Sequence, residues 1–138
     1  MNKNPIIVVD DDTEDLELMQ EAFADLNIES EIIVFNNGFK FLDFVKGMKN
    51  KIFFILCDID MSEIDGLALK KRIYEDEELR LKWVPFIFLS DNFASTAVMK
   101  AYSFGVQGYF IKPDTFDEMK DRLRHIVNYW SYSQHPNI

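Results

Sequence analysis

The sequence has little of what disulfide-bonded, membrane-spanning and nucleic-acid-binding proteins require. It contains one cysteine, Cys57, so no disulfide can form within the chain, which suits a reducing cytosol. No apolar run approaches the length of a membrane span, and the polar start, residues 1–4, is unlike a signal peptide. Lys and Arg number 15 against 24 Asp and Glu, and a net charge of −9 disfavours non-specific binding to nucleic acid or anionic membrane. We therefore expect a cytoplasmic protein that binds neither.

Length and composition suit one globular domain. A chain of 138 residues can bury roughly two-thirds of the surface that it exposes when unfolded, which is enough for a single core. Hydrophobic residues make up 48% and charged residues 28%, and no long linker, repeat or low-complexity stretch divides the chain. We expect a single domain over residues 1–138, with its core at about 5–131 and a short tail at 132–138.

Five short segments have the composition of β-strands. Four are continuous apolar runs, typical of strands that are buried on both faces in a parallel sheet: Ile6–Val9, Ile52–Cys57, Pro85–Leu89 and Gly108–Ile111. A further strand is predicted over Glu31–Phe35. Because Cys57 ends one of the buried runs, we interpret it as a small apolar core residue.

Segments with helical spacing of apolar residues follow each strand. They start near Thr13, near Gly38, at Gly66 (ending at Tyr74), near Ala94 (ending near Gly105) and after Thr115, which forms a capping box with Glu118. In the fourth segment the predicted core residues are Ala94, Ala97, Val98 and Ala101. Alternating strands and helices, (βα)5, predict an α/β fold with a doubly wound, five-stranded parallel sheet.

The four apolar runs each stop at a residue type that phosphoryl transfer requires. Asp10, Asp11 and Asp12 follow the first run, and the other three runs lead to Asp58, Ser90 and Lys112. Ligands of an open parallel sheet bind outside the carboxyl ends of its strands, so these side chains should meet at one edge.

The chemistry of such a cluster favours a metal-assisted phosphoryl acceptor. Asp10, Asp11 and Asp58 would repel one another unless a cation lay among them, and Mg²⁺ prefers oxygen ligands of this kind. A carboxylate beside such a metal can attack phosphorus and form an aspartyl phosphate. Lys112 and the Ser90 hydroxyl can supply the positive charge and the hydrogen-bond donor that the phosphoryl oxygens require.

Each residue also has a simpler interpretation. The acidic run at 10–12 can cap a helix, Asp58 can begin a turn, and Lys112 can be a solvated loop end. Ser90 alone would carry no information, because serine is common after strands. The joint occurrence of these residues at the ends of the predicted strands favours the phosphoryl-acceptor interpretation.

These residues and motifs resemble those of a response-regulator receiver domain, the phosphoacceptor part of bacterial two-component signalling. The resemblance covers residues 5 to about 131 and rests on VVDDD, CDIDMSEIDG, FLS and GYFIKP at the four strand ends. It implies a stand-alone, CheY-like domain with flavodoxin-like strand order 2-1-3-4-5. It also implies a signalling domain whose only catalysis is its own phosphorylation and dephosphorylation.

The resemblance assigns the phosphoacceptor and the metal ligands. Asp58 matches the phosphorylated aspartate. Asp10 and Asp11 match the acidic pair that holds Mg²⁺ (or Mn²⁺), with Asp11 as the direct ligand, and the backbone carbonyl of Asp60 matches the position that completes the metal shell. Asp65-Gly66 matches the turn after the acceptor loop.

The resemblance also assigns the switch residues. Ser90 matches the hydroxyl that bonds the phosphoryl group when the domain switches, and Tyr109 matches the aromatic that turns inward on activation. Lys112 matches the lysine that contacts the phosphoryl oxygens. The Lys112–Pro113 peptide bond matches one that is cis in this family, as only a bond before proline readily can be.

The implied partners are a histidine kinase or a histidine phosphotransfer protein. The face formed by the fourth helix, fifth strand and fifth helix is the expected binding surface for a kinase, a target or a second copy. Its candidate residues either form this surface or complete the core, and they are Phe93, Met99, Tyr102, Phe104, Tyr109 and Tyr129.

Five positions depart from the family pattern or modulate it. Ser62 replaces a usual proline, so the loop after Asp58 should be less rigid. Asp91 replaces a small residue and should slow phosphorylation or hydrolysis by narrowing access and repelling the phosphoryl group. Asn92, with Asp60, occupies a position that shapes water access, and Asp114 replaces a common phenylalanine.

Two other functions fit parts of the pattern. Asp58-Ile59-Asp60 resembles the D-x-D motif of Mg²⁺-dependent phosphatases of the haloacid-dehalogenase type, although the acidic pair then lies on the wrong side of the lysine in sequence order. The second is a receiver-like interaction module that does not depend on phosphorylation, which only Asp91 and Ser62 favour.

Overall fold

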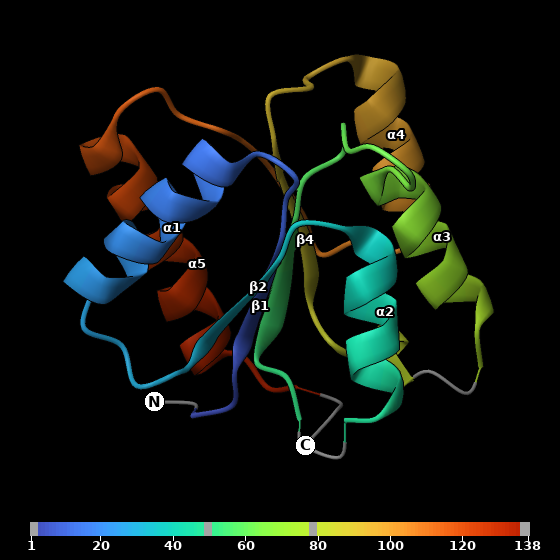
Figure 1. Ribbon diagram of the computed structural model, residues 1–138, viewed down its shortest axis with the longest axis horizontal. Coiled ribbons are helices and arrows are strands. Elements are labelled where there is room, and N and C mark those ends of the chain that lie inside the picture. Colours follow the sequence, from blue (N-terminus) through green and yellow to red (C-terminus); the bar gives the residue numbers. More distant parts are fainter. Residues whose placement is uncertain (1–2, 49–50, 78–79, 136–138) are drawn as a thin grey trace.

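Five parallel strands form the central sheet of the computed structural model, which describes residues 3–48, 51–77 and 80–135 (Figure 1). The strands are β1 (Ile6–Val9), β2 (Ile32–Phe35), β3 (Phe54–Cys57), β4 (Phe86–Ser90) and β5 (Gly108–Ile111). Their order is β2-β1-β3-β4-β5, with every neighbouring pair parallel. The expected α/β fold and strand order are therefore confirmed.

Helices cover both faces of the sheet. They are α1 (Thr13–Asp25), α2 (Gly38–Lys46), α3 (Gly66–Glu75), α4 (Ser95–Ser103) and α5 (Phe116–Tyr132), with a short 3-10 helix, η1 (Arg80–Trp83), before β4. Figure 1 shows α1 and α5 on one side and α2, α3 and α4 on the other. No helix among the described residues is both long enough and apolar enough to cross a membrane.

The apolar strands divide the core into two halves because successive side chains point to opposite faces. Ile6 and Val8 of β1 pack in the half that α1 and α5 cover, whereas Ile7 and Val9 pack in the half that α2, α3 and α4 cover. All of β1 and β3 is buried, as expected for central strands, and Cys57 is a core residue.

Helix α4 buries fewer residues than its sequence pattern predicts. Of its expected core residues, Ala97 and Ala101 are buried, but Val98 is half-buried and Ala94 is exposed as the residue before the helix. Ala94 also provides no side-chain cap for the helix N-terminus. The prediction for these two residues was wrong because the helix turns only its small alanines towards the sheet, so most of its surface faces outward.

Gly66 fixes the start of α3 against the loop after β3. A Cβ atom at this position would lie 2.1 Å from the backbone oxygen of Asp58, so only glycine permits the approach. The Gly66 N–H donates to the Ile59 carbonyl at 2.8 Å, and the Asp65 side chain caps the helix by accepting from the Ala68 N–H at 2.7 Å. This packing holds the Asp58 backbone at the carboxyl edge of the sheet.

Candidate functional site

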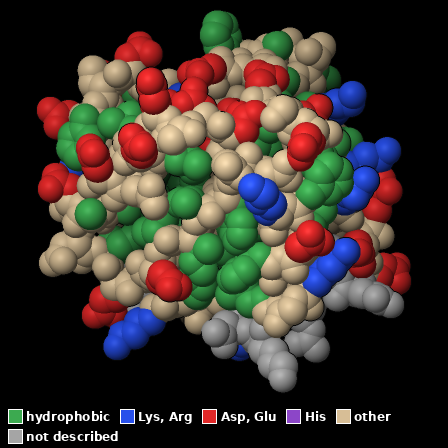
Figure 2. Space-filling view, viewed as in Figure 1, with side chains coloured by type: hydrophobic (Ala, Val, Ile, Leu, Met, Phe, Trp, Pro, Cys, Tyr) green, Lys and Arg blue, Asp and Glu red, His purple; other side chains and the backbone are tan. Residues whose placement is uncertain are grey.

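Carboxylates from two strand ends meet at the carboxyl edge of the sheet. Oxygens of Asp10, Asp11 and Asp58 all lie within 4.8 Å of one another. Asp10 and Asp58 are buried and Asp11 is half-buried. Asp10 follows β1 and Asp58 follows β3, and these two strands are neighbours in the sheet. Acidic side chains gather along the upper part of the face in Figure 2, where these strands end in Figure 1.

Lys112 places its ammonium among three carboxylates. Its Nζ lies 2.8 Å from Asp10 Oδ2, 2.7 Å from Asp15 Oδ2 and 3.1 Å from Asp58 Oδ2. The contact to Asp10 is a charge contact and lacks the alignment of a good hydrogen bond, whereas the other two are hydrogen bonds. The lysine side chain is 5% exposed, so water screens these charges weakly.

The pKa values of Asp10 and Lys112 indicate that the cluster carries more negative than positive charge. Burial raises the pKa of Asp10 to about 6, although the Lys112 ammonium and the Asp12 N–H oppose that shift. Burial lowers the pKa of Lys112, but its close contacts with the Asp10 and Asp15 carboxylates outweigh burial and raise that pKa overall. Three carboxylates therefore contact one firmly protonated ammonium and Asp11 lies beside two of them, which leaves negative charge for a further cation to neutralise.

Asp58 is held in a fixed orientation. It is 7% exposed, and its Oδ1 accepts from the Ile59 N–H at 2.7 Å while Oδ2 faces Lys112. The Cys57 thiol, 3.1 Å away, donates to the Asp58 backbone oxygen. One carboxylate oxygen is thus engaged by the backbone, and the other lies beside a positive charge.

Asp11 is held from the loop after β3. Its Oδ2 accepts from the Ser62 N–H at 2.8 Å and lies 3.2 Å from the Ser62 hydroxyl. A proline at position 62 could not donate the first of these bonds, because it has no N–H. The sequence showed that Ser62 departs from the family pattern, but its bond to Asp11 depends on tertiary structure and was not predicted.

Ser90, Asn92 and Tyr109 are linked in the loop between β4 and α4. The Ser90 hydroxyl is fully buried and accepts from the Asn92 N–H at 3.1 Å. The Tyr109 hydroxyl donates to the Asn92 carbonyl, and its ring packs 5.9 Å from that of Phe88. Burial, and then the charges of Asp60 and Asp58, raise the pKa of Tyr109, which keeps this phenol a donor. The expected switch residues, Ser90 and Tyr109, are therefore linked through the backbone of Asn92.

Other predicted residues lie at the rim or differ from expectation. Asp60 and Asp91 are exposed. The Lys112–Pro113 bond, expected to be cis, is trans, and no peptide bond between described residues is cis. The trans isomer of a peptide bond before proline is still favoured by about 0.5–1 kcal/mol. Lys112 reaches the carboxylates with its backbone in the trans form, so the site does not require the cis isomer.

Asp15 is a site residue that sequence reasoning missed. It lies in the first turn of α1, where Asp12 caps the helix by accepting from the Asp15 N–H at 3.1 Å. Helix side chains lean towards the N-terminus, so a carboxylate in the first turn points back to the sheet edge from which the helix starts. The position of Asp15 in the first helical turn was therefore the feature of the sequence that could have predicted its place in the site.

The donor set fits a hard divalent cation. Carboxylate oxygens are the ligands that Mg²⁺ and Mn²⁺ prefer, and oxygens of Asp10, Asp11 and Asp58 lie close enough together to share one ion. The excess of carboxylates over ammonium groups supports the same assignment. The residues therefore fit the metal that the sequence led us to expect.

Comparison with known proteins matches the chain to a described family. Residues 6–124 match the family model of the response regulator receiver domain. The probable methanogenesis regulatory protein FilR2 of Methanothrix harundinacea is 27% identical over 129 residues, which are 91% of this chain and 82% of that protein. The chain also matches longer response regulators of Arabidopsis thaliana, of whose length it spans about a fifth.

Solved structures share the fold. The phosphorylated cyanobacterial phytochrome response regulator RcpA superposes with a TM-score of 0.87 at 21% identity, over 98% of this chain and 99% of that one. The Mn²⁺-bound form of response regulator Rcp1 gives a TM-score of 0.83 at 22% identity, over 96% and 99% of the two chains.

Proposed function

This chain belongs to the response regulator receiver family, whose members are signalling domains of two-component systems rather than conventional enzymes, and we propose that Asp58 is its phosphoacceptor. The proposed donor is a phosphohistidine of a histidine kinase or a histidine phosphotransfer protein in the cytoplasm. A carboxylate oxygen of Asp58 attacks phosphorus, the P–N bond breaks, and the imidazole leaves with the bonding electrons. Hydrolysis of the aspartyl phosphate then restores the carboxylate.

The observation that carries this proposal is the position of Asp58 beside Lys112. The Asp58 Oδ2 to Lys112 Nζ distance is 3.1 Å, and the backbone fixes the other carboxylate oxygen. A phosphoryl group on Asp58 would develop negative charge on oxygens beside this ammonium. Preorganised positive charge of this kind stabilises the transition state of phosphoryl transfer.

Asp10 and Asp11 are the proposed side-chain ligands of Mg²⁺ or Mn²⁺. Asp58 and the backbone carbonyl of Asp60 complete the set of ligands that the protein supplies. When bound, the metal would neutralise charge on the phosphoryl oxygens. The 2.8 Å bond from the Ser62 N–H orients the Asp11 carboxylate, and the Asp12 N–H holds Asp10 Oδ1 at 2.9 Å. These bonds keep both carboxylates directed at the cluster.

The proposed switch runs through the loop between β4 and α4. A phosphoryl oxygen on Asp58 would accept the Ser90 O–H and so reorient the hydroxyl that accepts from the Asn92 N–H, and Tyr109 is bonded to the carbonyl of the same asparagine. Phosphorylation would thus change the stability of the hydrogen bond between Asn92 and Tyr109 of β5. It would thereby shift the domain between two conformations.

The proposed readout surface is the face formed by α4, β5 and α5. Its large exposed side chains are Phe93 at 76%, Met99 at 71%, Tyr102 at 53% and Tyr129 at 63% exposure, whereas Phe104 and Tyr109 are half-buried. Exposed aromatic and methionine side chains are enriched at protein interfaces. This face is proposed to bind a kinase, a target or a second copy.

Labelling of Asp58 tests the central proposal. The chain is incubated with acetyl phosphate and Mg²⁺ and examined by mass spectrometry, with Asp58→Asn as the control. Stoichiometric, Mg²⁺-dependent labelling that the control lacks is expected. Absence of labelling in the folded protein would instead favour the phosphorylation-independent interaction module. Multiple turnover of small phosphate esters would favour a phosphatase.

A separate experiment tests whether the readout surface binds a second copy of the chain. Size-exclusion chromatography is run with and without beryllofluoride, a phosphoryl mimic, over a wide range of protein concentrations. A shift to a dimer with the mimic is expected if the second copy is the partner. An unchanged monomer would restrict the readout surface to other proteins.

A further inference from the structure

Lys70 is a buried lysine that lies outside the site described above. It belongs to α3, is 2% exposed, and holds its Nζ 5.4 Å from the centroid of the Phe86 ring. Among the described residues no carboxylate forms an ion pair with it, and burial is the cause that shifts its pKa. Lysine is rarely buried without a partner, because the charged form loses its hydration.

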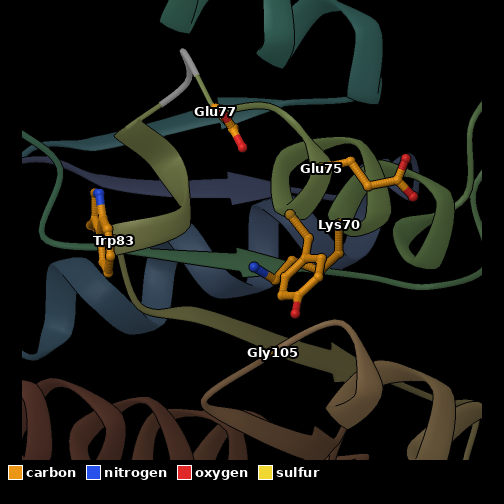
Figure 3. Close-up of a pocket in the computed structure, with 6 residues that line it drawn as sticks. Lys70, Glu75, Glu77, Trp83 and Gly105 are labelled. Carbon is orange, nitrogen blue, oxygen red and sulfur yellow. The ribbon is translucent and has the colours of Figure 1, made fainter.

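The side chain opens onto a hollow at the end of α3. The hollow has a volume of about 520 Å³ and is lined by Lys70, Tyr74, Glu75, Glu77, Trp83 and Gly105 (Figure 3). The Lys70 amine points from α3 into this space towards Trp83, while the Glu75 carboxylate points away from it. Glu75 instead lies 3.7 Å from the exposed Lys71. Because the lysine side chain is otherwise buried, this hollow is the path by which a small molecule would approach the amine.

The environment favours the neutral, nucleophilic amine. Burial lowers the pKa of Lys70 from 10.5 to about 8. At pH 7.5 about a quarter of Lys70 would then be neutral, against about a thousandth for an ordinary lysine. The titratable groups among the described residues that line the hollow are Tyr74, Glu75 and Glu77, and none of them offsets the effect of burial.

We propose that Lys70 is an acylation site, modified at Nζ by a small activated acyl donor, an acyl phosphate or an acyl thioester, that enters through this hollow. The Nζ lone pair attacks the acyl carbon and the N–C bond forms. The bond from carbon to the phosphate oxygen or the thiol sulfur breaks, and the leaving group takes its electron pair. The amine proton passes to water.

The product suits its surroundings better than the free lysine does. Acylation converts a buried ammonium, which the face of the Phe86 ring stabilises only in part, into an uncharged amide, which removes the cost of burying a charge without a carboxylate partner. The hollow provides room for a group as small as acetyl. The proposal does not depend on phosphorylation of Asp58.

Site-resolved acetylation rates test this proposal, with Lys71 as an internal control. Lys71 is the next residue of the same helix, but its side chain is 57% exposed and paired with Glu75. The full chain is treated with acetyl phosphate at pH 6.5–9.5, and peptide mass spectrometry gives the rate at each lysine. We expect Lys70 to react about tenfold faster than Lys71 at pH 7.5, since its larger neutral fraction outweighs the lower nucleophilicity of a weaker base.

The pH profile and a denatured sample complete the test. The Lys70 rate should level off above about pH 8, whereas the Lys71 rate should still rise. In guanidinium chloride the two rates should become equal, because the hollow no longer exists. Lys70→Arg, checked for folding by circular dichroism, should remove one acetyl group and leave Lys71 labelling unchanged. Equal or faster labelling of Lys71 in the folded protein at pH 7.5 would overturn the proposal, whether or not the variant folds.

Discussion

Asp15 lies closer to the Lys112 ammonium than the phosphoacceptor does: the Asp15 Oδ2 to Nζ distance is 2.7 Å and the Asp58 Oδ2 to Nζ distance is 3.1 Å. Asp15 comes from α1 and is not one of the three clustered carboxylates. It therefore competes for the positive charge that a phosphoryl group on Asp58 would require. We infer that Asp15 stabilises the unphosphorylated state.

The first prediction follows from this competition. Replacing Asp15 with Asn should lower the acetyl phosphate concentration that gives half-maximal labelling of Asp58 by up to about fivefold, the scale of a partly exposed charge pair of roughly 1 kcal/mol. Glu14→Gln is the matched control, because Glu14 is an exposed neighbour in the same helical turn. Equal decreases in both variants would assign the effect to net charge and contradict a specific role for Asp15.

The second prediction concerns the bond between Ser62 and Asp11. Ser62→Pro removes the N–H that donates to Asp11 Oδ2, so the carboxylate loses its orientation. Binding of Mg²⁺, measured by isothermal titration calorimetry, should weaken by about tenfold, as for other groups that orient metal ligands. Ser62→Ala keeps the N–H and loses only the hydroxyl, so it should bind almost as the wild type does. Unchanged affinity in a folded proline variant would mean that this bond does not orient Asp11.

The third prediction separates phosphorylation from switching. Ser90→Ala removes the hydroxyl that accepts from the Asn92 N–H, so the link to Tyr109 loses its anchor at the site. Beryllofluoride with Mg²⁺ should still bind, but the accompanying changes in the NMR signals of α4 and β5 should be much smaller than in the wild type. Ser90→Thr retains a hydroxyl and should preserve them. Full-sized changes in the alanine variant would show that another residue carries the switch.

The fourth prediction tests the unusual residue after Ser90. Asp91 is exposed at the rim of the site, where its carboxylate can repel an incoming phosphoryl donor. Asp91→Ala should increase the rate of acetyl-phosphate labelling by about two- to threefold at low ionic strength and by less at high salt, because salt screens exposed charges. Asp114→Ala, which removes another exposed carboxylate from the last loop, is the control. If labelling rate and phosphate lifetime are unchanged in Asp91→Ala, the proposed repulsion is absent.

The sequence predicts the features that depend on strand periodicity. Apolar runs such as Ile6–Val9 favour strands of a parallel sheet, whose carboxyl edge then carries the residues that follow them. The run Gly108–Ile111 was expected to be buried on both faces, but it forms the partly exposed edge strand β5. Strand periodicity is therefore sufficient to predict that Asp10, Asp58 and Lys112 lie together. The strand boundaries differ by one or two residues, as in β3, which begins at Phe54 rather than Ile52.

Features that depend on side-chain direction could not be predicted in the same way. The contact of Asp15 with Lys112 requires the orientation of α1 relative to the sheet, and the Ser62 bond requires the path of a loop. Helical spacing alone placed Ala94 and Val98 of the α4 region in the core, but Ala94 is exposed before the helix and Val98 is only half-buried. A periodic pattern predicts which face of a helix is apolar, but it does not predict how deeply that face is buried.

The burial of Lys70 leads to a prediction about stability and pH. Its folded-state pKa, about 8, lies below the ordinary 10.5, so the folded state releases this proton first. Below pH 8 both states hold the proton and folding bears the full cost of burying the charge. Between pH 8 and 10.5 the unfolded chain binds more protons at this group than the folded protein, so its contribution to stability rises with pH.

Lys70→Met should therefore be more stable than the wild type below pH 8, by up to about 3 kcal/mol, because methionine fills a similar volume without a charge. The advantage should shrink as pH rises from 8 to 10.5, and urea denaturation of both proteins across this range measures it. Lys71→Met controls for the loss of a lysine on the same helix and should show no such trend, since its side chain is 57% exposed. A Lys70→Met variant less stable than the wild type at pH 7 would mean that the ammonium has a stabilising partner in solution, and that its burial carries no net cost.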